Sequence, residues 1–402
     1  MIRFLTAGES HGQALVGILE GMPAGVKIEV SYINHQLKRR QQGYGRGGRM
    51  KIEKDEVKIL SGARFGKTTG SPIALMIENR DWKNWREVMA VQGGRPENVE
   101  HIGIVRPGHA DYSASMKYRY DDVRNSIERA SARETAMRVA VGTVIRKFLE
   151  DVGIFIGSHV VRVGSAAYKS RDEIDGKIVE WTKASCGAYK VSEEADKSEV
   201  RILSEEVSAH AIEAIKKVKK EGDTLGGIFE VIVSGVPVGL GSHVHYDRKI
   251  EAQLSQAIMS IPAVKAVEVG DGIENAARPG SQVHDEMYPD ENGNVMRKTN
   301  RAGGTEGGIT VGENIVVRGF MKPIATLMQP LKTVDIRTGN AVEARRERSD
   351  FCAVPACSVI GEAVVAPVLA NAFLEKFGGD SMKEIGERYH LKEDSEPDSH
   401  KG

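Results

Sequence analysis

The chain has 402 residues, of which 56 are Lys or Arg and 56 are Asp or Glu, so its formal net charge is zero. A balanced charge argues against a general nucleic-acid-binding protein, because such a surface needs a basic excess. Hydrophobic residues make up 40% and charged residues 28% of the chain, which indicates a globular protein with a substantial core.

No apolar run approaches the roughly 20 residues that a membrane span requires, and the N-terminal residues do not resemble a signal peptide. We therefore expect a cytoplasmic protein with no membrane partner. The three cysteines, Cys186, Cys352 and Cys357, are odd in number and lack CxxC spacing. This pattern argues against a disulfide framework and a structural zinc site, and it favours buried thiols.

Apolar periodicity predicts strands and helices along the chain. In chain order we expect strands at 14–19 and 73–77, a helix at 126–149, a strand at 154–163, a helix at 208–221, a strand at 228–233, a helix at 249–259, a strand at 315–317 and a helix at 359–377. Several strands follow one another between helices, which favours an α+β fold over a doubly wound parallel sheet. We expect one domain over 1–378, with irregular polar structure at 168–200, and a polar C-terminal tail over 379–402.

Two glycine-rich segments imitate nucleotide-binding motifs. Residues 43–48 satisfy GxGxxG, but they follow a basic segment and precede a strand-like one, whereas a dinucleotide fingerprint follows a strand and opens a helix. Residues 62–68 imitate a P-loop with one residue too few between the glycines, and we interpret them as a turn.

The first of these segments also belongs to an arginine-rich loop. Arg39, Arg40, Arg46 and Arg49 lie within eleven residues of one another, separated by glycines that make the loop adaptable. Guanidinium groups so arranged can enclose a multiply charged anion. An RNA-binding RGG element and a solvated basic surface are the alternative interpretations.

Two histidines lie in glycine-containing loops without apolar cover. His11 is part of Gly8-Glu9-Ser10-His11-Gly12, and His109 is part of Arg106-Pro107-Gly108-His109-Ala110-Asp111. An imidazole that a ligand can approach transfers protons near neutral pH, so both are candidates for acid–base chemistry, against the alternative of ordinary surface histidines. His243 and His245 form an HxH pair without an obvious third ligand, so we predict no metal site.

Further anion-binding signals lie at 127–138, where Ser, Arg, Glu and Thr begin a helical pattern, and at 302–308, 322–326 and 348–352. Helix N-termini bind anions through free N–H groups, and Arg129 and Arg133 would reinforce such a site. A capped, solvated helix start is the alternative.

Taken in order, these segments resemble the chorismate synthase family from Met1 to about Phe377. The resemblance rests on the arginine loop and on segments 8–12, 106–111, 131–136, 260–268, 303–308 and 348–350. It implies a helical layer between antiparallel sheets, assembled as a homotetramer. It also implies a lyase of the shikimate pathway of aromatic amino-acid biosynthesis, which eliminates phosphate from 5-enolpyruvylshikimate 3-phosphate to give chorismate and requires reduced FMN without net redox change.

The resemblance also implies residue roles. His11 would protonate or stabilise the leaving phosphate, His109 would favour the productive protonation state of the reduced flavin, and Asp350 would assist the flavin in taking the ring proton. Substrate-binding positions would be Arg40, Arg46, Arg49, Arg106 and Arg133. Flavin-contacting positions would be Arg129, Ala130, Ser131, Pro262, Ala263, Gly307, Lys322, Pro323, Ile324, Ala325, Thr326 and Arg348.

Some implications of the resemblance remain open at this point. Arg40 and Arg46 match positions associated with NADPH, so the chain either reduces its own flavin or relies on a separate flavin reductase. Ser349 replaces a His found in many relatives, so no role of that His transfers. A flavin-dependent oxidoreductase and a non-enzymatic anion- or RNA-binding module are the alternative functions.

Overall fold

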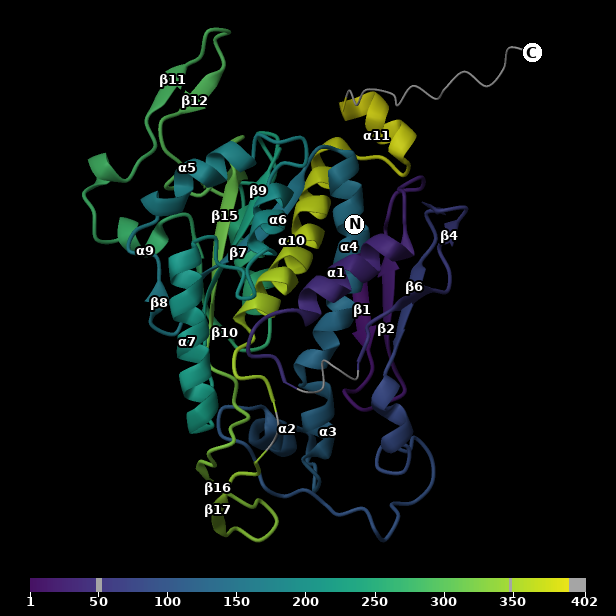
Figure 1. Ribbon diagram of the computed structural model, residues 1–402. Helices are drawn as coiled ribbons and strands as arrows, with labels where there is room; N and C mark the ends of the chain where they lie inside the picture. The colour runs from purple at the N-terminus through teal and green to yellow at the C-terminus, as the bar shows by residue number, and fades with distance from the viewer. Residues whose placement is uncertain (48–52, 347–348, 390–402) are drawn as a thin grey trace.

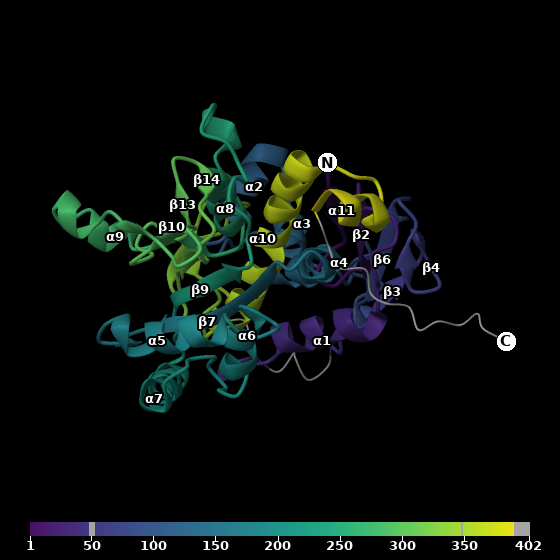
Figure 2. The same ribbon diagram turned by 90° about the horizontal axis from the view of Figure 1, so that it is seen from above.

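The computed structural model describes residues 1–47, 53–346 and 349–389. Two antiparallel sheets lie on either side of a layer of helices (Figures 1 and 2). The first sheet contains β1 (Arg3–Ala7), β2 (Ala14–Glu20), β6 (Ile73–Glu78) and β3 (Val57–Ile59), in the order β1-β2-β6-β3. Alternate residues of β6, Ile73, Leu75 and Ile77, are fully buried, so one face of this sheet covers the helices.

The second sheet contains β10 (Val264–Val269), β15 (Ile315–Met321), β9 (Gly227–Ser234), β7 (Phe155–Val163) and β8 (Ala166–Ala167), in the order β10-β15-β9-β7-β8. Its central strands are buried on both faces, because α10 (Val354–Phe377) packs on one side and α6 (Tyr189–Ala195) on the other. Burial on both faces explains why β9 shows no alternation of apolar and polar residues and is apolar from Ile228 to Val233 except for Glu230.

The helical layer is built around α4 (Thr135–Asp151) and α10, with α1 (Val30–Gln41) and α8 (Ile250–Met259) beside them. Figure 2 shows α4 and α10 between the two sheets. Helix α10 is apolar all round and long enough to cross a membrane, but 78% of its most apolar window is buried inside the protein, as in a core helix. A Cβ added at Gly142 of α4 would collide with the backbone of Ala363, so this glycine lets the two helices approach closely.

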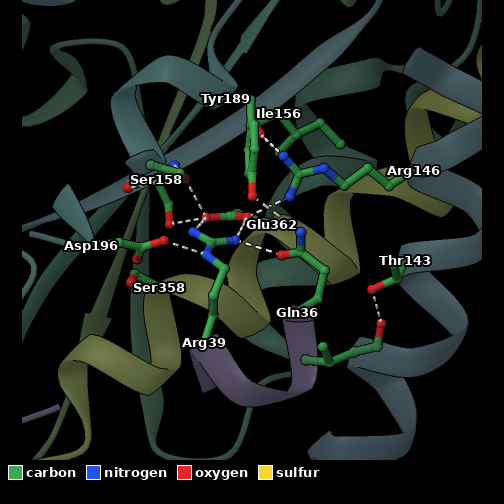
Figure 3. Close-up of polar contacts among 12 residues, drawn as sticks. Gln36, Arg39, Thr143, Arg146, Ile156, Ser158, Tyr189, Asp196, Ser358 and Glu362 are labelled. Carbon is green, nitrogen blue, oxygen red and sulfur yellow. Dashed lines mark hydrogen bonds and ion pairs between the residues drawn. The ribbon is translucent and has the colours of Figure 1, made fainter. Parts of the chain in front are cut away.

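A buried ionic cluster joins the elements of this layer (Figure 3). Its centre is the carboxylate of Glu362 on α10, which accepts hydrogen bonds from Arg39 of α1 at 2.7 and 2.9 Å and from Arg146 of α4 at 2.6 Å. The hydroxyl groups of Ser158 and Ser192 complete its coordination. One carboxylate of α10 thereby links α10 to α1, α4, α6 and β7.

The remaining helices and strands surround these layers. They are the helices α2 (Asp111–Tyr118), α3 (Arg124–Arg129), α5 (Asp172–Trp181), α7 (Glu205–Glu221), α9 (Gly272–Asn275) and α11 (Met382–Tyr389), the short 3-10 helices η2 (Arg80–Asn84), η3 (Ala132–Glu134), η4 (Tyr246–Arg248) and η5 (Gly280–Gln282), and the hairpins β4–β5 (Ala63–Arg64, Lys67–Thr68), β11–β12 (Met287–Pro289, Val295–Arg297), β13–β14 (Thr305–Glu306, Ile309–Thr310) and β16–β17 (Lys332–Val334, Ala341–Glu343).

Several sequence expectations need correction. The helix expected at 126–149 is broken: α3 ends at Arg129, Ser131 is extended and caps η3 by accepting from the Arg133 N–H, and α4 begins at Thr135. Segment 168–200 is not irregular, because it forms α5 and α6 over a small apolar cluster that includes Ile174 and Val191. The turn expected at 62–68 is confirmed as the β4–β5 hairpin.

The segment after residue 378 was expected to be a polar tail. Its first part forms α11, where Ile385 is buried and the ring of Tyr389 packs against Phe373 and Phe377. Residues 390–402 lie outside the described residues.

Candidate active site

The described residues enclose a cavity of about 520 Å³ where the first turns of α4 and α10 meet the last turn of α1. Thr135 begins α4, and Ala356, Cys357 and Ile360 of α10 line the opposite side. The positive ends of two helix dipoles therefore face this space, which favours an anionic ligand. Loops from both halves of the chain complete the lining.

His11 reaches the cavity from the loop between β1 and β2. A single carboxylate, Glu128 of α3, accepts from its backbone N–H at 2.7 Å and lies 3.0 Å from ring Nδ1 through both oxygens. The ring also stacks on Trp85, with centroids 4.0 Å apart. Burial acts to raise the pKa of Glu128, but its contacts with His11 outweigh burial and lower that pKa.

His109 also has a carboxylate partner. Its Nδ1 lies 2.5 Å from Oδ1 of Asp111, the first residue of α2, and Arg106 donates to the same carboxylate through Nε at 2.7 Å and Nη2 at 3.0 Å. Burial acts to raise the pKa of Asp111, but the hydrogen bonds from His109 and Arg106 hold it well below its usual range. His109 and Arg106 are thus held as one unit.

Arg40 and Arg133 share the buried carboxylate of Asp55. Arg133 contacts one of its oxygens through Nη1 and donates through Nε to Asn79 at 2.9 Å, and Arg40 lies 3.4 Å from the other oxygen. Arg40 also donates to the Thr135 hydroxyl at 3.0 Å. Burial, partly offset by Asp55, lowers the pKa of Arg40 to about 10. The Arg40 guanidinium therefore remains cationic at neutral pH.

The remaining part of the arginine loop packs against the segment that carries Asp350. The Asp350 carboxylate accepts from the backbone N–H of Gly47 at 2.6 Å and pairs with Arg46 at 2.7 Å. Gly45 of the GxGxxG pattern allows this contact, because it has a φ of 90° and a Cβ there would crowd Cys352. In residues 43–47, the described part of the motif, one loop thus packs on another.

A second wall of the cavity is largely apolar. It consists of Ile261, Pro262, Ala263, Met321, Ile324 and Ala325, with Lys322 and Thr326 at its polar edge. Ala263 has a φ of 71°, an uncommon conformation for a residue with a side chain. Lys322 donates through Nζ to the carbonyl of Gly108, the residue before His109. The cavity lining thus combines cationic and apolar residues.

Most of the predicted site residues meet in this cavity. His11, His109, Asp350, Arg40, Arg46, Arg106 and Arg133 line it, as do Ala130, Ser131, Pro262, Ala263, Lys322, Ile324, Ala325 and Thr326.

Other candidates lie elsewhere. Pro323 and Gly307 are not among its lining residues, and Arg129 instead donates to the carbonyls of Thr6 and Gly8. Arg49 and Arg348 lie outside the described residues. The HxH pair is in an exposed loop, where His245 contacts Asp247, and no cluster of three metal-ligating side chains occurs in the described part of the chain.

Sequence reasoning missed the groups that position the histidines and arginines. Asp55 and Trp85 carried no motif signal, and Glu128 stood out only as part of segment 127–138. Each is far along the chain from a residue that it supports. Asp111 was considered only as part of the His109 segment, although it lies two residues after His109 in the sequence. Ser10 was also passed over, and its hydroxyl lies 3.0 Å from that of Ser131.

Comparisons with known proteins agree with this geometry. A family model described as Chorismate synthase matches residues 2–374. A chorismate synthase of Pelodictyon phaeoclathratiforme is 54% identical over 396 residues, 98% of this chain and 98% of the relative. One of Chlorobaculum tepidum is 54% identical over 395 residues, 97% of each chain.

A solved structure described as "Crystal Structure of Chorismate Synthase" has a TM-score of 0.76 and 45% sequence identity, and the match covers 97% of this chain and 96% of that one. The expected α+β fold with antiparallel sheets is confirmed by this match. Because the family model spans nearly the whole chain and full-length relatives are more than half identical, the chain belongs to the chorismate synthase family, a family of lyases.

Proposed function

We propose that this cavity is where the chain carries out the reaction of its family, the anti-1,4-elimination of phosphate from 5-enolpyruvylshikimate 3-phosphate that gives chorismate. The observation that carries the proposal is the meeting of two histidines and four arginines from separate segments around one cavity. The reaction breaks one C–H bond and one C–O bond without net oxidation. Its site must bind a multiply charged anion, exclude water and hold groups that transfer protons.

The basic residues of the cavity suit the substrate. The substrate carries one phosphate and two carboxylates. The described lining contains five basic side chains against the single carboxylate of Asp350, and these are Arg40, Arg46, Arg106, Arg133 and Lys322. Guanidinium groups bind phosphate and carboxylate through paired N–H donors, and they do so more strongly where water is excluded. Asp55 and Asp111, behind the arginines, fix the direction in which those donors point.

We assign proton transfer to the leaving phosphate to His11. Its side chain is 19% exposed and lines the cavity, and its Nδ1 faces Glu128. This leaves Nε2 as the nitrogen for the ligand. A phosphate leaves more readily when its bridging oxygen receives a proton or a positive charge, and an imidazole can supply either near neutral pH.

The residues present fit a reduced flavin beside the substrate. The apolar wall of Pro262, Ala263 and Ile324 suits a flat aromatic ring system, and Lys322 and Ser131 offer polar groups at its edges. When bound, reduced FMN supplies transient electron density to the substrate, chemistry that no side chain in the cavity offers. The cavity residues would bind the cofactor, orient it and exclude water.

His109 and Asp350 both line the cavity and would act on the bound flavin. Nδ1 of His109 lies 2.5 Å from the Asp111 carboxylate and 3.1 Å from Arg106 Nη2, and these two contacts orient the imidazole. Arg46 and the Gly47 N–H hold Asp350 in place. Both groups are therefore oriented before any ligand binds.

The source of the reducing equivalents is a separate part of the proposal. Arg40 and Arg46 match positions associated with NADPH, but Arg40 is 3% exposed and already contacts Thr135, Ala132 and Asp55. These contacts favour a role for Arg40 in binding the phosphate or carboxylates of the substrate over a role in binding NADPH. We therefore expect an external flavin reductase or a chemical reductant to be needed.

We also propose that the chain assembles as a homotetramer in the cytoplasm. The hairpin β11–β12 extends away from the rest of the molecule (Figure 1) and exposes Met287, Tyr288, Val295 and Met296. A two-stranded hairpin is at best marginally stable alone in water, and an apolar one favours contact with another subunit.

The test is an anaerobic reaction of the purified protein with 5-enolpyruvylshikimate 3-phosphate and chemically reduced FMN, in which chorismate absorbance and phosphate release are followed together. We expect equal amounts of both products and many turnovers for each flavin. Consumption of one reduced flavin per product would instead indicate an oxidoreductase. Replacing the chemical reductant by NADPH then tests whether the chain reduces its own flavin.

An RNA-binding function centred on the arginine loop makes a different prediction. It requires an affinity for RNA that decreases steeply with salt and does not depend on His11 or His109. In the structure, Arg39 and Arg40 are buried in ion pairs, which removes two of the cations that such a function would use.

A further inference from the structure

The carboxylate of Glu128 contacts both the backbone and the ring of His11. Its carboxylate accepts from the His11 backbone N–H at 2.7 Å and lies 3.0 Å from Nδ1 of the ring, and its own carbonyl accepts from the Ser10 N–H at 3.1 Å. The side chain of Glu128 has no exposed surface. One buried residue therefore fixes both the backbone and the ring of His11.

The direction of the ring contact has a chemical consequence. An ionised carboxylate only accepts hydrogen bonds, so the Nδ1 that faces it must carry the proton. In the neutral imidazole, Nε2 is then the basic nitrogen. In the imidazolium, Nε2–H is the bond that remains available to a ligand in the cavity.

We propose that Glu128 is a positioning residue for the proton-transfer step: it holds His11 in the tautomer with the proton on Nδ1 and thereby presents Nε2 to the leaving phosphate. The inference rests on the proposed role of His11. It adds a residue that does not line the cavity and acts only through the imidazole.

The surroundings of the ring support this assignment. Trp85 stacks on the imidazole with an interplanar angle of 27°, and the Arg124 guanidinium lies over the Trp85 ring, 5.0 Å from its centroid. Arg124 also donates to Glu128 at 3.3 Å, and the Trp85 Nε1–H donates to Asp81 at 2.9 Å. The stack restricts rotation of the ring, and Arg124 helps keep Glu128 ionised. The lowered pKa of Glu128, in which its contacts with His11 outweigh burial, agrees with a permanent carboxylate.

The first test compares two glutamate variants. Glu128→Gln keeps the shape of the side chain, but an amide can also donate to Nδ1 and so permits the wrong tautomer. Glu134→Gln is the matched control, because Glu134 is also largely buried and pairs with an arginine four residues away, Arg138, but contacts no histidine.

We expect kcat of Glu128→Gln to decrease by about 10- to 100-fold with little change in KM. The control should stay within about twofold of the unaltered enzyme. Equal losses in both variants, or none in Glu128→Gln, would overturn the proposal.

The second test needs no folded variant at position 128. Solid-state NMR of the unaltered protein labelled with ¹⁵N-histidine reports which ring nitrogen carries the proton, and the His11→Ala protein identifies the His11 signals among the 11 histidines. We expect a protonated Nδ1 and an unprotonated Nε2 for neutral His11. A protonated Nε2 and an unprotonated Nδ1 would show that Glu128 does not set the tautomer of His11, whatever kcat the glutamate variants have.

Failures of the two proposals are distinguishable. If the His11→Ala enzyme has a normal kcat, the proposed role of His11 is wrong. The proposed contribution of Glu128 to the reaction is then wrong as well. The NMR pattern then still decides whether Glu128 sets the tautomer.

Discussion

At the scale of single residues, the cavity relies on carboxylates that lie behind the groups expected to meet the ligand. Glu128 supports His11, Asp111 supports His109 and Arg106, and Asp55 supports Arg40 and Arg133. Such partners fix tautomers and the direction of N–H donors before the ligand arrives, which lowers the reorganisation needed during the reaction.

Arg106 offers a direct test of this arrangement. Lys at this position would keep the charge but lose the forked contact with Asp111 and the contact with His109. We expect Arg106→Lys to lower kcat/KM by about 10- to 100-fold, in line with the loss of about 1.5–3 kcal/mol of charged hydrogen bonding. Steady-state kinetics measure this, and values within twofold of the unaltered enzyme would contradict the account.

The sequence indicated the candidate reactive residues better than the residues that support them. Their glycine-containing loops made His11 and His109 candidates for acid–base chemistry, and the family resemblance implied their roles. Glu128 could not, because 117 residues separate it from His11 and only the fold brings the two together. Arg129, one residue along α3, was expected to contact the flavin; it does not line the cavity, and it donates to the carbonyls of Thr6 in β1 and Gly8 in the β1–β2 loop.

At the scale of elements, two features hold the central helices together. The first is the close approach of α4 and α10 at Gly142. A methyl group there would collide with the Ala363 backbone, whereas Gly176 in α5 has nothing near it.

We therefore expect Gly142→Ala to lower the free energy of unfolding by about 1–3 kcal/mol through overpacking. The matched variant Gly176→Ala should raise it by about 0.5–1 kcal/mol, because alanine favours a helix over glycine. Denaturant unfolding measures both. Stabilisation by Gly142→Ala would mean that the helices are not in close contact.

The second feature is the ionic cluster around Glu362. Burial alone would raise the pKa of this carboxyl group, but Arg39 and Arg146 outweigh it and hold the pKa well below its usual value of 4.5. Removing the charge leaves buried guanidinium groups without their partner. We expect Glu362→Gln to lower the free energy of unfolding by about 3–5 kcal/mol at pH 7.

This cluster also predicts a pH dependence. Because the pKa of Glu362 is lower in the folded than in the unfolded state, its contribution is complete above pH 4.5 and is lost as the pH falls further. The difference in melting temperature between the unaltered protein and Glu362→Gln should thus be constant from pH 7 to about 5.5 and shrink below about 4.5. A difference that grows on acidification would contradict the assignment.

Elements with apolar periodicity could be predicted from the sequence, and those without it could not. Strands such as β6 and helices such as α8 lie close to their expected positions. Helix α1 was missed because its buried face includes Gln36, Arg39 and Arg40, which contact the ionic cluster and the cavity rather than apolar side chains. The break at Ser131 was missed because apolar residues continue on either side of it.

At the scale of the whole molecule, the cavity is a product of topology. Its lining comes from the β1–β2 loop, from the ends of three central helices and from loops next to the second sheet. The order of strands in each sheet depends on long-range pairing, which periodicity does not encode. The family resemblance implied the helical layer between antiparallel sheets and the set of site residues, but no strand order, and the residues alone indicated only several separate anion-binding segments.

The projecting hairpin provides a prediction about assembly. If β11–β12 contacts another subunit, Met287→Glu combined with Val295→Glu should lower the assembly state and leave the folded subunit intact. Light scattering after size-exclusion chromatography, together with circular dichroism, measures the two properties. An unchanged mass in solution would mean that this hairpin is not part of the subunit contact.

The central claim is that His11 and His109 in this one cavity carry the elimination. The most direct measurement is kcat of His11→Ala and His109→Ala in the anaerobic assay, with the melting temperature and FMN affinity of each protein measured alongside. The account predicts that kcat decreases by about 100-fold or more in both variants while stability and FMN binding remain close to those of the unaltered enzyme. Near-normal turnover in either variant would contradict the role assigned to that histidine.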